Sequence, residues 1–436
     1  MLLSVFVTVF LVKVEALKME NKVVDKLDVC VVGAGIIGTL TAYTLQKEGH
    51  QVTLIDKEQP GNGCSFGNAG MLARSSFVPL ANPATVWQAP GWLLNPDGPL
   101  CVNWGYLTKI VPWLLGYLKA GFAGDLVEKG EDIHQLTDKS VEMFTAIAEE
   151  IGCSDLIVKT DYLQVYRTQK GFTKGEGDMN ARRRLGFSID NLNAEQLHEL
   201  EPSLSKEYQY AHHLADHAFV HNPHELVTQI YQAFVKLGGV FIEQSVTNIE
   251  SKDSGNVITT DSQTINCDKL VMAAGAFSAR LLKSTGVNIP LETERGYHVS
   301  CPTPKVTVNR PVMDGELKFF VTPMSVGYRF AGLVEFAGLD KPPQAKRVDV
   351  LTRSAKKMIP QLNTDNATSW MGFRPTLCDS VPVIGYAPDN KHIIYAFGHQ
   401  HLGLTCAPMT ASLVSDLVAQ REPAIDVSKY CVSRLL

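Results

Sequence analysis

A strand, a glycine-rich turn, a helical stretch and a second strand follow one another between Val29 and Asp56, and no other part of the chain restricts the fold as strongly. The β-branched run from Val29 to Val32 predicts a buried strand, and the turn after it reads GAGIIG. A helical pattern follows, and the next strand, Val52 to Ile55, ends in the acidic residue Asp56. This order is typical of the first βαβ unit of a doubly wound parallel sheet. We therefore expect an α/β fold with a Rossmann-like domain.

The three glycines of the turn have the spacing of a dinucleotide-binding site. Gly33 allows the tight turn, Gly35 lets the backbone approach a pyrophosphate, and Gly38 lets the helix pack against the strand. The free N–H groups and the positive dipole end at the helix start attract phosphates. Asp56 is placed to accept hydrogen bonds from both ribose hydroxyls and to repel a 2′-phosphate. The competing interpretation is an ordinary βαβ unit whose glycines only shape the turn.

Length, charge and cysteine spacing limit the number of domains and the classes of ligand that the chain can have. A chain of 436 residues, 45% of them hydrophobic, is long enough for two globular domains. Its formal net charge of -5 offers no basic field for nucleic acid. The nine cysteines have neither CxxC nor Cys/His spacing, which indicates reduced intracellular thiols rather than disulfides or a zinc site. The histidines between residues 212 and 224 lack the spacing of a helical ligand pair, and we expect no bound metal.

The first residues form an apolar run whose role the sequence leaves open. Leu2 to Val12 is too short to span a bilayer and lacks the basic start of a signal peptide. Met19 precedes a polar stretch, which makes it a candidate for the true start of the protein. A weak membrane anchor or a signal segment is the alternative.

Glycine and proline dominate residues 60 to 112, which we expect to be mostly loop. Four of the five tryptophans gather in this region: Trp87, Trp92, Trp104 and Trp113. Because aromatic side chains usually pack inside proteins, we expect these four in the core. Contact with a membrane or with a quinone is the alternative.

Regular patterns return further along the chain. Asn222 predicts a helix N-cap, with Glu225 completing a capping box. One strand is expected from Val240 to Ile249, and the alternation between residues 295 and 335 suggests a large antiparallel sheet. The last helix is expected from Ala407 to Val418.

Two segments rich in small residues suit a close approach of the nucleotide. Cys64 to Leu72, CSFGNAGML, is a permissive loop with several free N–H groups, which we expect to cover the nucleotide. A plain surface turn is the alternative for this loop. Leu270 to Leu281, LVMAAGAFSARL, is a strand, then Ala-Ala-Gly, then a helix, although any packing corner favours such residues.

Arg374 is the main candidate for binding a substrate. It lies in the largely apolar segment GFRPTLCDSVPVIG, where Pro375 restricts the backbone. A guanidinium there suits bidentate capture of a carboxylate, and a structural ion pair is the alternative. His399 and His401 are candidate bases in the segment AFGHQHLGLTCAP, but we expect each of them to position other groups instead.

These five motifs, in this order, resemble the D-amino-acid dehydrogenase family among the glycine oxidase-like, FAD-dependent amine oxidoreductases. The resemblance covers roughly residues 27 to 420 and rests on VVGAGIIG with Asp56, SFGNAG, MAAGAFSARLL, GFRPTLCDSVPVIG and FGHQHLGLT. It implies a Rossmann-like FAD-binding domain formed by residues 26–75, 222–290 and 371–436. An antiparallel-sheet substrate domain, residues 76–221 and 291–370, is inserted between these segments.

The resemblance also implies the residues of the site. Arg374 would hold the substrate carboxylate, and Tyr297 and His399 complete the catalytic set. No cysteine matches the attachment position of covalently flavinylated sarcosine oxidases, so FAD is expected to be non-covalent. The family's usual Gly-His-Gly reads Gly398-His399-Gln400 here, and Asp56 replaces a Glu that is common in relatives. The expected FAD-binding residues are Gly33, Gly35, Ile36, Ile37, Gly38, Asp56, Lys57, Ser65, Asn68, Ala69, Gly70, Met71, Val246, Ala274, Gly275, Gly398, Gly403, Leu404 and Thr405.

The activity implied by the resemblance is oxidative deamination of D-amino acids. Hydride leaves Cα for flavin N5, and the imine is hydrolysed to a 2-oxo acid and ammonia. Electrons would pass to a quinone or a respiratory chain, in a cytoplasmic protein with peripheral contact to the inner face of the cytoplasmic membrane. The alternatives are an O2-using oxidase of glycine, sarcosine or a D-proline or hydroxyproline derivative, an NAD-only dehydrogenase, and a flavin-free binding protein such as the GDP-dissociation inhibitors.

Overall fold

A parallel sheet forms one half of the protein, as the computed structural model shows for residues 26–122, 126–252 and 254–436. The apolar run from Leu2 to Val12 and Met19 lie outside these described residues. The sheet has the order β18-β19-β12-β1-β2-β8, in which β18 alone runs antiparallel to its neighbour. Its strands are β1 (Asp28–Val32), β2 (Gln51–Asp56), β8 (Val240–Glu243), β12 (Lys269–Met272), β18 (Val383–Ala387) and β19 (Asn390–Phe397).

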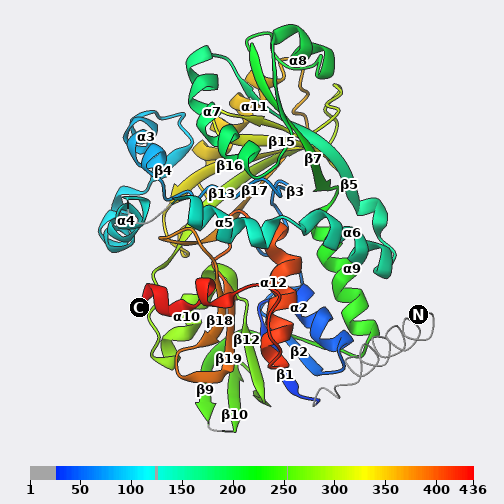
Figure 1. Ribbon diagram of the computed structural model, residues 1–436, viewed down its shortest axis with the longest axis vertical. Coiled ribbons are helices and arrows are strands. Elements are labelled where there is room, and N and C mark those ends of the chain that lie inside the picture. Colours follow the sequence, from blue (N-terminus) through cyan, green and yellow to red (C-terminus); the bar gives the residue numbers. More distant parts are fainter. Residues whose placement is uncertain (1–25, 123–125, 253) are drawn as a thin grey trace, which may run out of the picture.

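Helices cover one face of this sheet and a small sheet covers the other. α2 (Ile36–Lys47), α9 (Pro223–Lys236) and α12 (Gly403–Val418) share an apolar core with β1. Figure 1 shows α2 and α12 beside the strands in the lower half of the molecule. Side chains of the three-stranded antiparallel sheet pack against the opposite face. Its strands are β9 (Val246–Lys252), β10 (Gly255–Thr260) and β11 (Thr264–Cys267), and the short helix α10 (Ser278–Leu282) lies next to them.

A larger sheet forms the other half of the protein. It has ten strands and is mainly antiparallel, although the β5–β14 and β4–β16 pairs are parallel, so the expected antiparallel sheet is in fact mixed. α7 (Gln169–Arg184), α8 (Ala194–Leu200) and α11 (Ala345–Met358) flank it. Its strands are β3 (Met71–Leu72), β4 (Leu100–Val102), β5 (Ile157–Tyr166), β6 (Ile189–Leu192), β7 (Tyr210–Val220), β13 (Leu291–Cys301), β14 (Val312–Asp314), β15 (Phe319–Met324), β16 (Gly327–Phe336) and β17 (Thr368–Leu377).

The expected division into two domains stays a prediction. β3 and β17 pair within the large sheet, although both lie wholly or mostly in segments assigned to the FAD-binding domain. Conversely, α5 (Leu126–Thr137) and α6 (Ser140–Ile151) lie in a segment assigned to the substrate domain, yet Phe144 of α6 packs into the core around α2 and α12. The chain therefore crosses between the two sheets several times.

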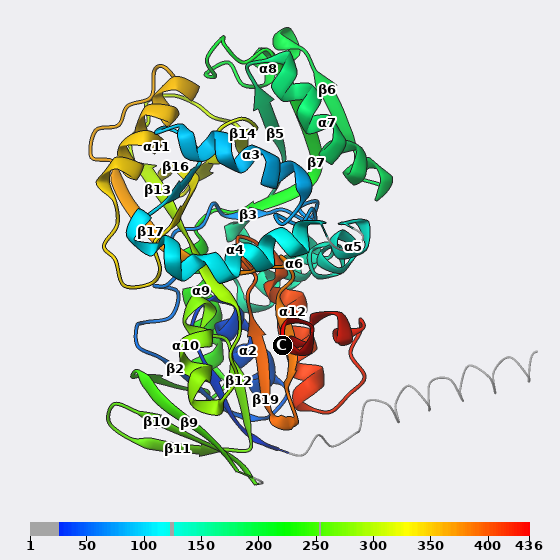
Figure 2. The same cartoon turned by 90° about the vertical axis from the view of Figure 1, so that its left-hand side faces the viewer.

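The expectation of loop between residues 60 and 112 is wrong for much of its length. α3 (Pro83–Leu94) and α4 (Leu107–Phe122) form there, with Pro90 and Pro112 inside them. α3 begins like an ordinary capped helix, because the Asn82 side chain accepts the Thr85 N–H at 2.9 Å and Pro83 takes the first position. In the view of Figure 2, α3 lies in front of the large sheet, and α4 lies below it, at the level between the large sheet and the parallel sheet.

The tryptophans of this region do not all enter the core, which corrects a second expectation. Trp113 on α4 is buried, donating its indole N–H to the carbonyl oxygen of Thr376 at 3.2 Å. Trp87 on α3 is 78% exposed and Trp104, just before α4, is 82% exposed. α3 has no buried residue, so these helices present an apolar surface to solvent.

Three smaller expectations also need correction. The strand expected from Val240 to Ile249 is two strands in different sheets, β8 and β9. The last helix begins at Gly403, earlier than expected. Asn222 does cap α9, accepting the Glu225 N–H at 3.2 Å, but the Glu225 carboxylate accepts the side-chain amide of Gln229 instead of closing a capping box.

No helix within the described parts of the chain combines the length and the apolar character needed to cross a bilayer.

Candidate active site

A cavity of about 2000 Å³ lies between the two sheets and collects most of the residues singled out in the sequence. Parallel register brings the ends of β1, β2 and β12 to one edge, because Val32 pairs with both Ile55 and Met272. The loops that follow these strands therefore open into the same space. Of the expected site residues, all line the cavity except Gly38 and Gly398.

The turn after β1 has room for backbone only. Gly33 has φ +110°, and a Cβ there would lie 2.4 Å from the carbonyl oxygen of Ala273. A Cβ on Gly38 would lie 1.8 Å from the carbonyl oxygen of Gly33. The absence of a side chain at Gly38 thus lets α2 pack closely against the turn after β1. Gly38 does not itself line the cavity. Both glycines are needed for the helix to begin directly at the edge of the cavity.

Two side chains hold this turn in place. Asp56, at the end of β2, accepts the Ala34 N–H at 2.6 Å, and the Ser65 hydroxyl accepts the Ile36 N–H at 2.9 Å. Burial raises the pKa of Asp56, and the Ala34 hydrogen bond opposes that rise. Lys57 follows, with its Nζ 4.4 Å from the centre of the Phe277 ring.

The loop from Cys64 to Leu72 is held by three side chains of the large sheet. Arg329 donates to the carbonyl oxygens of Phe66 at 3.2 Å and Asn68 at 3.0 Å. The Thr322 hydroxyl donates to the carbonyl oxygen of Ala69 at 2.8 Å, and His298 Nδ1 lies 2.9 Å from that of Gly67. Among the described residues, the N–H groups of Gly67, Asn68 and Ala69 have no acceptor. The loop thus directs its carbonyls to the sheet and keeps donors free, as an anionic ligand requires.

The Arg374 guanidinium lies over the backbone of Gly296 on the neighbouring strand β13. A Cβ on Gly296 would be 2.2 Å from a guanidinium nitrogen of Arg374. Arg374 donates to the carbonyl oxygen of Leu333 at 2.9 Å and contacts that of Gly332 at 3.4 Å. Burial lowers the pKa of Arg374, and the nearby Glu294 opposes that effect.

A bulge in β16 supplies those carbonyls. The pairing of β13 with β16 shifts register between Arg295 and Tyr297, where Gly332 and Glu335 are the partners. Leu333 lies in this bulge with φ +60°, in the left-handed region that a branched side chain rarely adopts. Such a residue costs on the order of 1–3 kcal/mol, which the contact with Arg374 helps to offset. The bulge therefore turns the Leu333 carbonyl toward Arg374.

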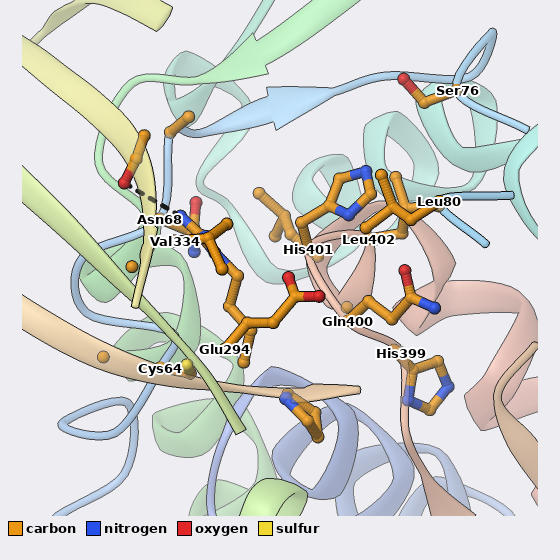
Figure 3. Close-up of a pocket in the computed structure, with 18 of the residues that line it drawn as sticks. Cys64, Asn68, Ser76, Leu80, Glu294, Val334, His399, Gln400, His401 and Leu402 are labelled. Carbon is orange, nitrogen blue, oxygen red and sulfur yellow. Dashed lines mark hydrogen bonds between the residues drawn. The ribbon is translucent and has the colours of Figure 1, made fainter. Parts of the chain in front are cut away.

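Glu294 is a site residue that the sequence interpretation missed. It is the β13 residue paired with Arg374 and is only 5% exposed. Figure 3 shows its carboxyl group in the middle of the cavity, extending toward Gln400. Burial raises its pKa to about 7, although Arg374 pulls that pKa down. The signal in the sequence was an acidic side chain, in LETERGYHV, on a strand expected to be buried.

The other two expected catalytic residues hold structural contacts. The Tyr297 hydroxyl donates to the Glu335 carboxylate and accepts the Gln344 N–H at 3.0 Å. His399 Nε2 lies 3.0 Å from the Thr410 hydroxyl, and burial lowers the pKa of His399 to about 3. Both residues line the cavity with these polar atoms engaged, so their catalytic roles stay predictions.

Gln400 and His401 lie at the start of the last motif, next to α12. Gln400 has φ +53°, and its buried side-chain nitrogen has no hydrogen-bond partner. His401 lines the cavity and is exposed to solvent, and the charge of Arg374 lowers its pKa. The Thr405 hydroxyl accepts the Ala73 N–H at 3.2 Å, which ties α12 to the strand β3. These contacts bring Gly403, Leu404 and Thr405 to the cavity.

The cavity fits an extended FAD. Its lining includes Asp56 and Val246 as well as Arg374, and the turn after Val32 accepts no side chain at Gly33. Asp56 would hold the ribose, the N–H groups at the start of α2 would hold the pyrophosphate, and the loop from Cys64 to Leu72 would cover the flavin side.

Comparison with known proteins agrees with this geometry. The chain is 34% identical over 418 residues to a protein named D-amino-acid oxidase from Bradyrhizobium diazoefficiens, covering 94% of this chain and 99% of that protein. It is 28% identical over 439 residues to a protein named D-amino acid dehydrogenase 2 from Ralstonia nicotianae, covering 94% and 100%. Glycine oxidase from Geobacillus kaustophilus has a similar fold, with a TM-score of 0.72 at 24% identity over 94% of this chain and 99% of that one.

A family model described as "FAD dependent oxidoreductase" matches residues 28–417. This range includes both sheets and every expected site residue. The chain therefore belongs to the DAO family of FAD-dependent oxidoreductases.

Proposed function

We propose that this protein oxidises D-amino acids to imines, which water then converts to 2-oxo acids and ammonia. The observation that carries the proposal is the position of Arg374, a guanidinium open to the cavity and braced by the backbone of β16. The names of the relatives from Bradyrhizobium and Ralstonia support D-amino acids as the substrate class. FAD, held without a covalent bond, accepts the hydride from Cα when it is bound.

Arg374 binds and orients the substrate. A charge-assisted bond between its guanidinium and the substrate carboxylate stabilises the complex by about 1.5–3 kcal/mol net. The Leu333 carbonyl limits the guanidinium to one position, so the carboxylate position also fixes Cα. Much of the catalytic effect then comes from orientation. Leu114 and Leu118 of α4 add apolar side chains to the lining of the cavity, which would reduce the water around the reacting amine.

The experiment is an anaerobic visible spectrum of the purified protein before and after adding D-amino acids, D-proline, glycine or sarcosine. We expect a yellow protein whose flavin band bleaches with D-amino acids. Bleaching by glycine or sarcosine alone would instead favour the oxidase alternatives, and a colourless protein that takes up no FAD would favour a binding protein. A colourless protein that reduces added NAD in the presence of one of these compounds would support the NAD-only dehydrogenase.

The role of Arg374 can be tested in the same assay. Arg374→Ala should abolish bleaching while the protein stays yellow, because the cofactor contacts lie elsewhere. Arg353→Ala is the matched control, since Arg353 is half exposed and pairs with Asp97 on the surface. An Arg374→Ala protein that is colourless, or one that still reacts, would contradict the assigned role.

The proposed electron acceptor is a membrane quinone. Some side chains of α3 and α4 line the cavity. Others on the same helices are apolar and exposed to solvent, among them Trp87, Leu94 and Leu115. Such a surface is typical of contact with a lipid or a hydrophobic partner. This exposed apolar surface supports a peripheral location on the inner face of the cytoplasmic membrane. The nine cysteines are all free, which is typical of a protein in a reducing compartment.

Readmitting air to the reduced protein separates the two acceptors. Slow reoxidation by oxygen and fast reoxidation by a soluble quinone are expected for the quinone-dependent enzyme. Rapid peroxide release would identify an oxidase, the activity named for the Bradyrhizobium relative.

A further inference from the structure

Glu294 is the one acidic side chain of the cavity wall that faces Arg374 across a strand pair. The two residues are direct partners of β13 and β17, so their side chains project from the same face of the sheet. Both line the cavity. Arg374 is satisfied by the carbonyl oxygens of Gly332 and Leu333, and no described residue forms a hydrogen bond or ion pair with Glu294.

A buried carboxyl group without a partner is costly unless a ligand supplies one. The neighbouring Glu292 shows the contrast, because its carboxylate accepts the Tyr106 hydroxyl and its side chain does not line the cavity. Glu294 instead extends into the open space (Figure 3). A cation at that place would satisfy it.

The proposed substrate carries such a cation next to its carboxylate. In an α-amino acid both groups are attached to Cα, and Arg374 and Glu294 are neighbours of opposite charge on one face. We propose that Glu294 binds the ammonium group of the substrate and accepts its proton before hydride leaves Cα. This inference rests on the proposed function and names the base that oxidation of an ammonium substrate requires.

The step balances as a single proton transfer. One N–H bond of the ammonium breaks, an O–H bond forms on Glu294, and the nitrogen keeps the electron pair. That lone pair then forms the C=N bond as hydride leaves Cα for the bound cofactor. His399 is a poor base, because burial lowers its pKa to about 3 and its Nε2 lies 3.0 Å from the Thr410 hydroxyl. The charge of Arg374 also lowers the pKa of His401.

The electrostatic surroundings agree with this role. Burial raises the pKa of Glu294 to about 7, Arg374 on β17 lowers it, and Glu292 on the same strand raises it. Burial raises the pKa of the Tyr117 phenol on α4, and the Glu294 charge raises it further. His401 and Cys64 are the remaining titratable groups beside Arg374. A carboxyl group that titrates near neutral pH is matched to proton transfer.

The test compares anaerobic flavin reduction by D-alanine in the wild type and in Glu294→Gln from pH 6 to 10. In the wild type, the second-order rate constant of reduction should rise with pH through about 7, as Glu294 ionises. In Glu294→Gln it should be about 100-fold lower at pH 7, a typical contribution of a general base. It should recover at high pH, where the substrate ammonium ionises by itself.

Glu292→Gln is the matched control, since it makes the same chemical change two residues away on the same strand. It should keep the wild-type rate and profile, apart from a slightly lower apparent pKa. An unchanged pH profile in Glu294→Gln would overturn the inference. So would a loss confined to D-lysine and D-arginine, because Glu294 would then recognise side chains instead.

A second measurement needs no variant. D-lactate has the shape of D-alanine with a hydroxyl group in place of the ammonium, and a flavin difference spectrum would measure its binding. Because ionised Glu294 would gain no cation from it, the Kd of D-lactate should rise about tenfold per pH unit above about 7. A pH-independent Kd would contradict the inference. If no amino acid bleaches the wild type, the proposed function itself fails, which this pair of measurements distinguishes.

Discussion

At the scale of single residues, the position of Arg374 depends on a missing side chain. Gly296 carries no Cβ where the guanidinium crosses β13, and it is an ordinary strand residue without a positive φ. Gly296→Ala is therefore tolerated by the backbone but displaces Arg374. We expect kcat/KM for the amino acid to fall about 10- to 100-fold, the equivalent of losing one charge-assisted bond.

The cofactor content of Gly296→Ala should stay unchanged, which absorbance at the flavin band would check. Gly91→Ala is a suitable control, because a Cβ on Gly91 in α3 would meet nothing within 4 Å. Equal kcat/KM values for the two variants would show that Arg374 does not need this space.

At the scale of elements, Arg329 on β16 connects the large sheet to the loop from Cys64 to Leu72. No described acidic side chain pairs with it, and burial lowers its pKa to about 10, so it still carries its charge at neutral pH. Arg329→Met keeps the apolar stem and removes both hydrogen bonds to the loop. We expect FAD binding to weaken at least about 10-fold, because two bonds to a charged donor are lost.

Removal of this buried charge should leave the apoprotein as stable as the wild type or more so. Titration of apoprotein with FAD and thermal unfolding of the apoprotein measure the two effects separately. If the variant lost stability but kept its FAD affinity, the loop contact would be structural only.

The elements also show what the sequence could and could not predict. The turn from Gly33 to Gly38 and its acidic partner Asp56 lie within one βαβ unit, so their local pattern was readable. Arg374 could be chosen as a candidate from the sequence because it precedes Pro375 in a largely apolar segment. Glu294 and Arg329 take their positions only through strand pairings across a long stretch of chain, and Leu333 takes its position only through a bulge. Neither propensity nor periodicity encodes those pairings.

In α3 and α4, by contrast, a local sequence signal predicted the wrong structure. Their prolines suggested loop, but Pro83 starts a helix and Pro90 and Pro112 are accommodated inside helices. Proline disfavours a helix interior by about 3 kcal/mol, so other interactions compensate here. Trp113 is one of them, because it packs against Tyr117 and Phe336.

At the scale of the whole molecule, buried neutral histidines should set the acid limit of stability. Burial lowers the pKa of four of them to between about 3 and about 4: His212, His217, His298 and His399. The unfolded chain takes up their protons below about pH 6.5, whereas the folded protein does not until about pH 4. Stability should therefore fall as pH drops through this window, by up to about 1.4 kcal/mol per pH unit for each histidine.

Thermal unfolding at pH 7.5, 6 and 5 measures this slope. His217→Gln should reduce the slope, since His217 is buried against Ser75. Thr228→Ala on α9, which removes no ionisable group, should not change it. Identical slopes in both variants would show that other groups control the acid transition.

The apolar surface of α3 and α4 gives a second prediction at this scale. Trp87→Glu combined with Leu94→Glu should lower quinone-dependent turnover at least about 10-fold, because a charge opposes contact with an apolar partner. Anaerobic bleaching by substrate should be unchanged. Leu237→Glu, which changes an exposed leucine elsewhere, is the control. Loss of bleaching in the double variant would mean that these helices serve the substrate reaction instead.

The cavity between the two sheets has a consequence for steady-state kinetics. If the amino acid and the electron acceptor both reach the flavin through this cavity, as proposed above, the oxidised product leaves before the acceptor enters. Initial rates measured against both substrates should then give parallel lines in double-reciprocal plots. The oxo acid should compete with the acceptor, because the two occupy the same form of the enzyme.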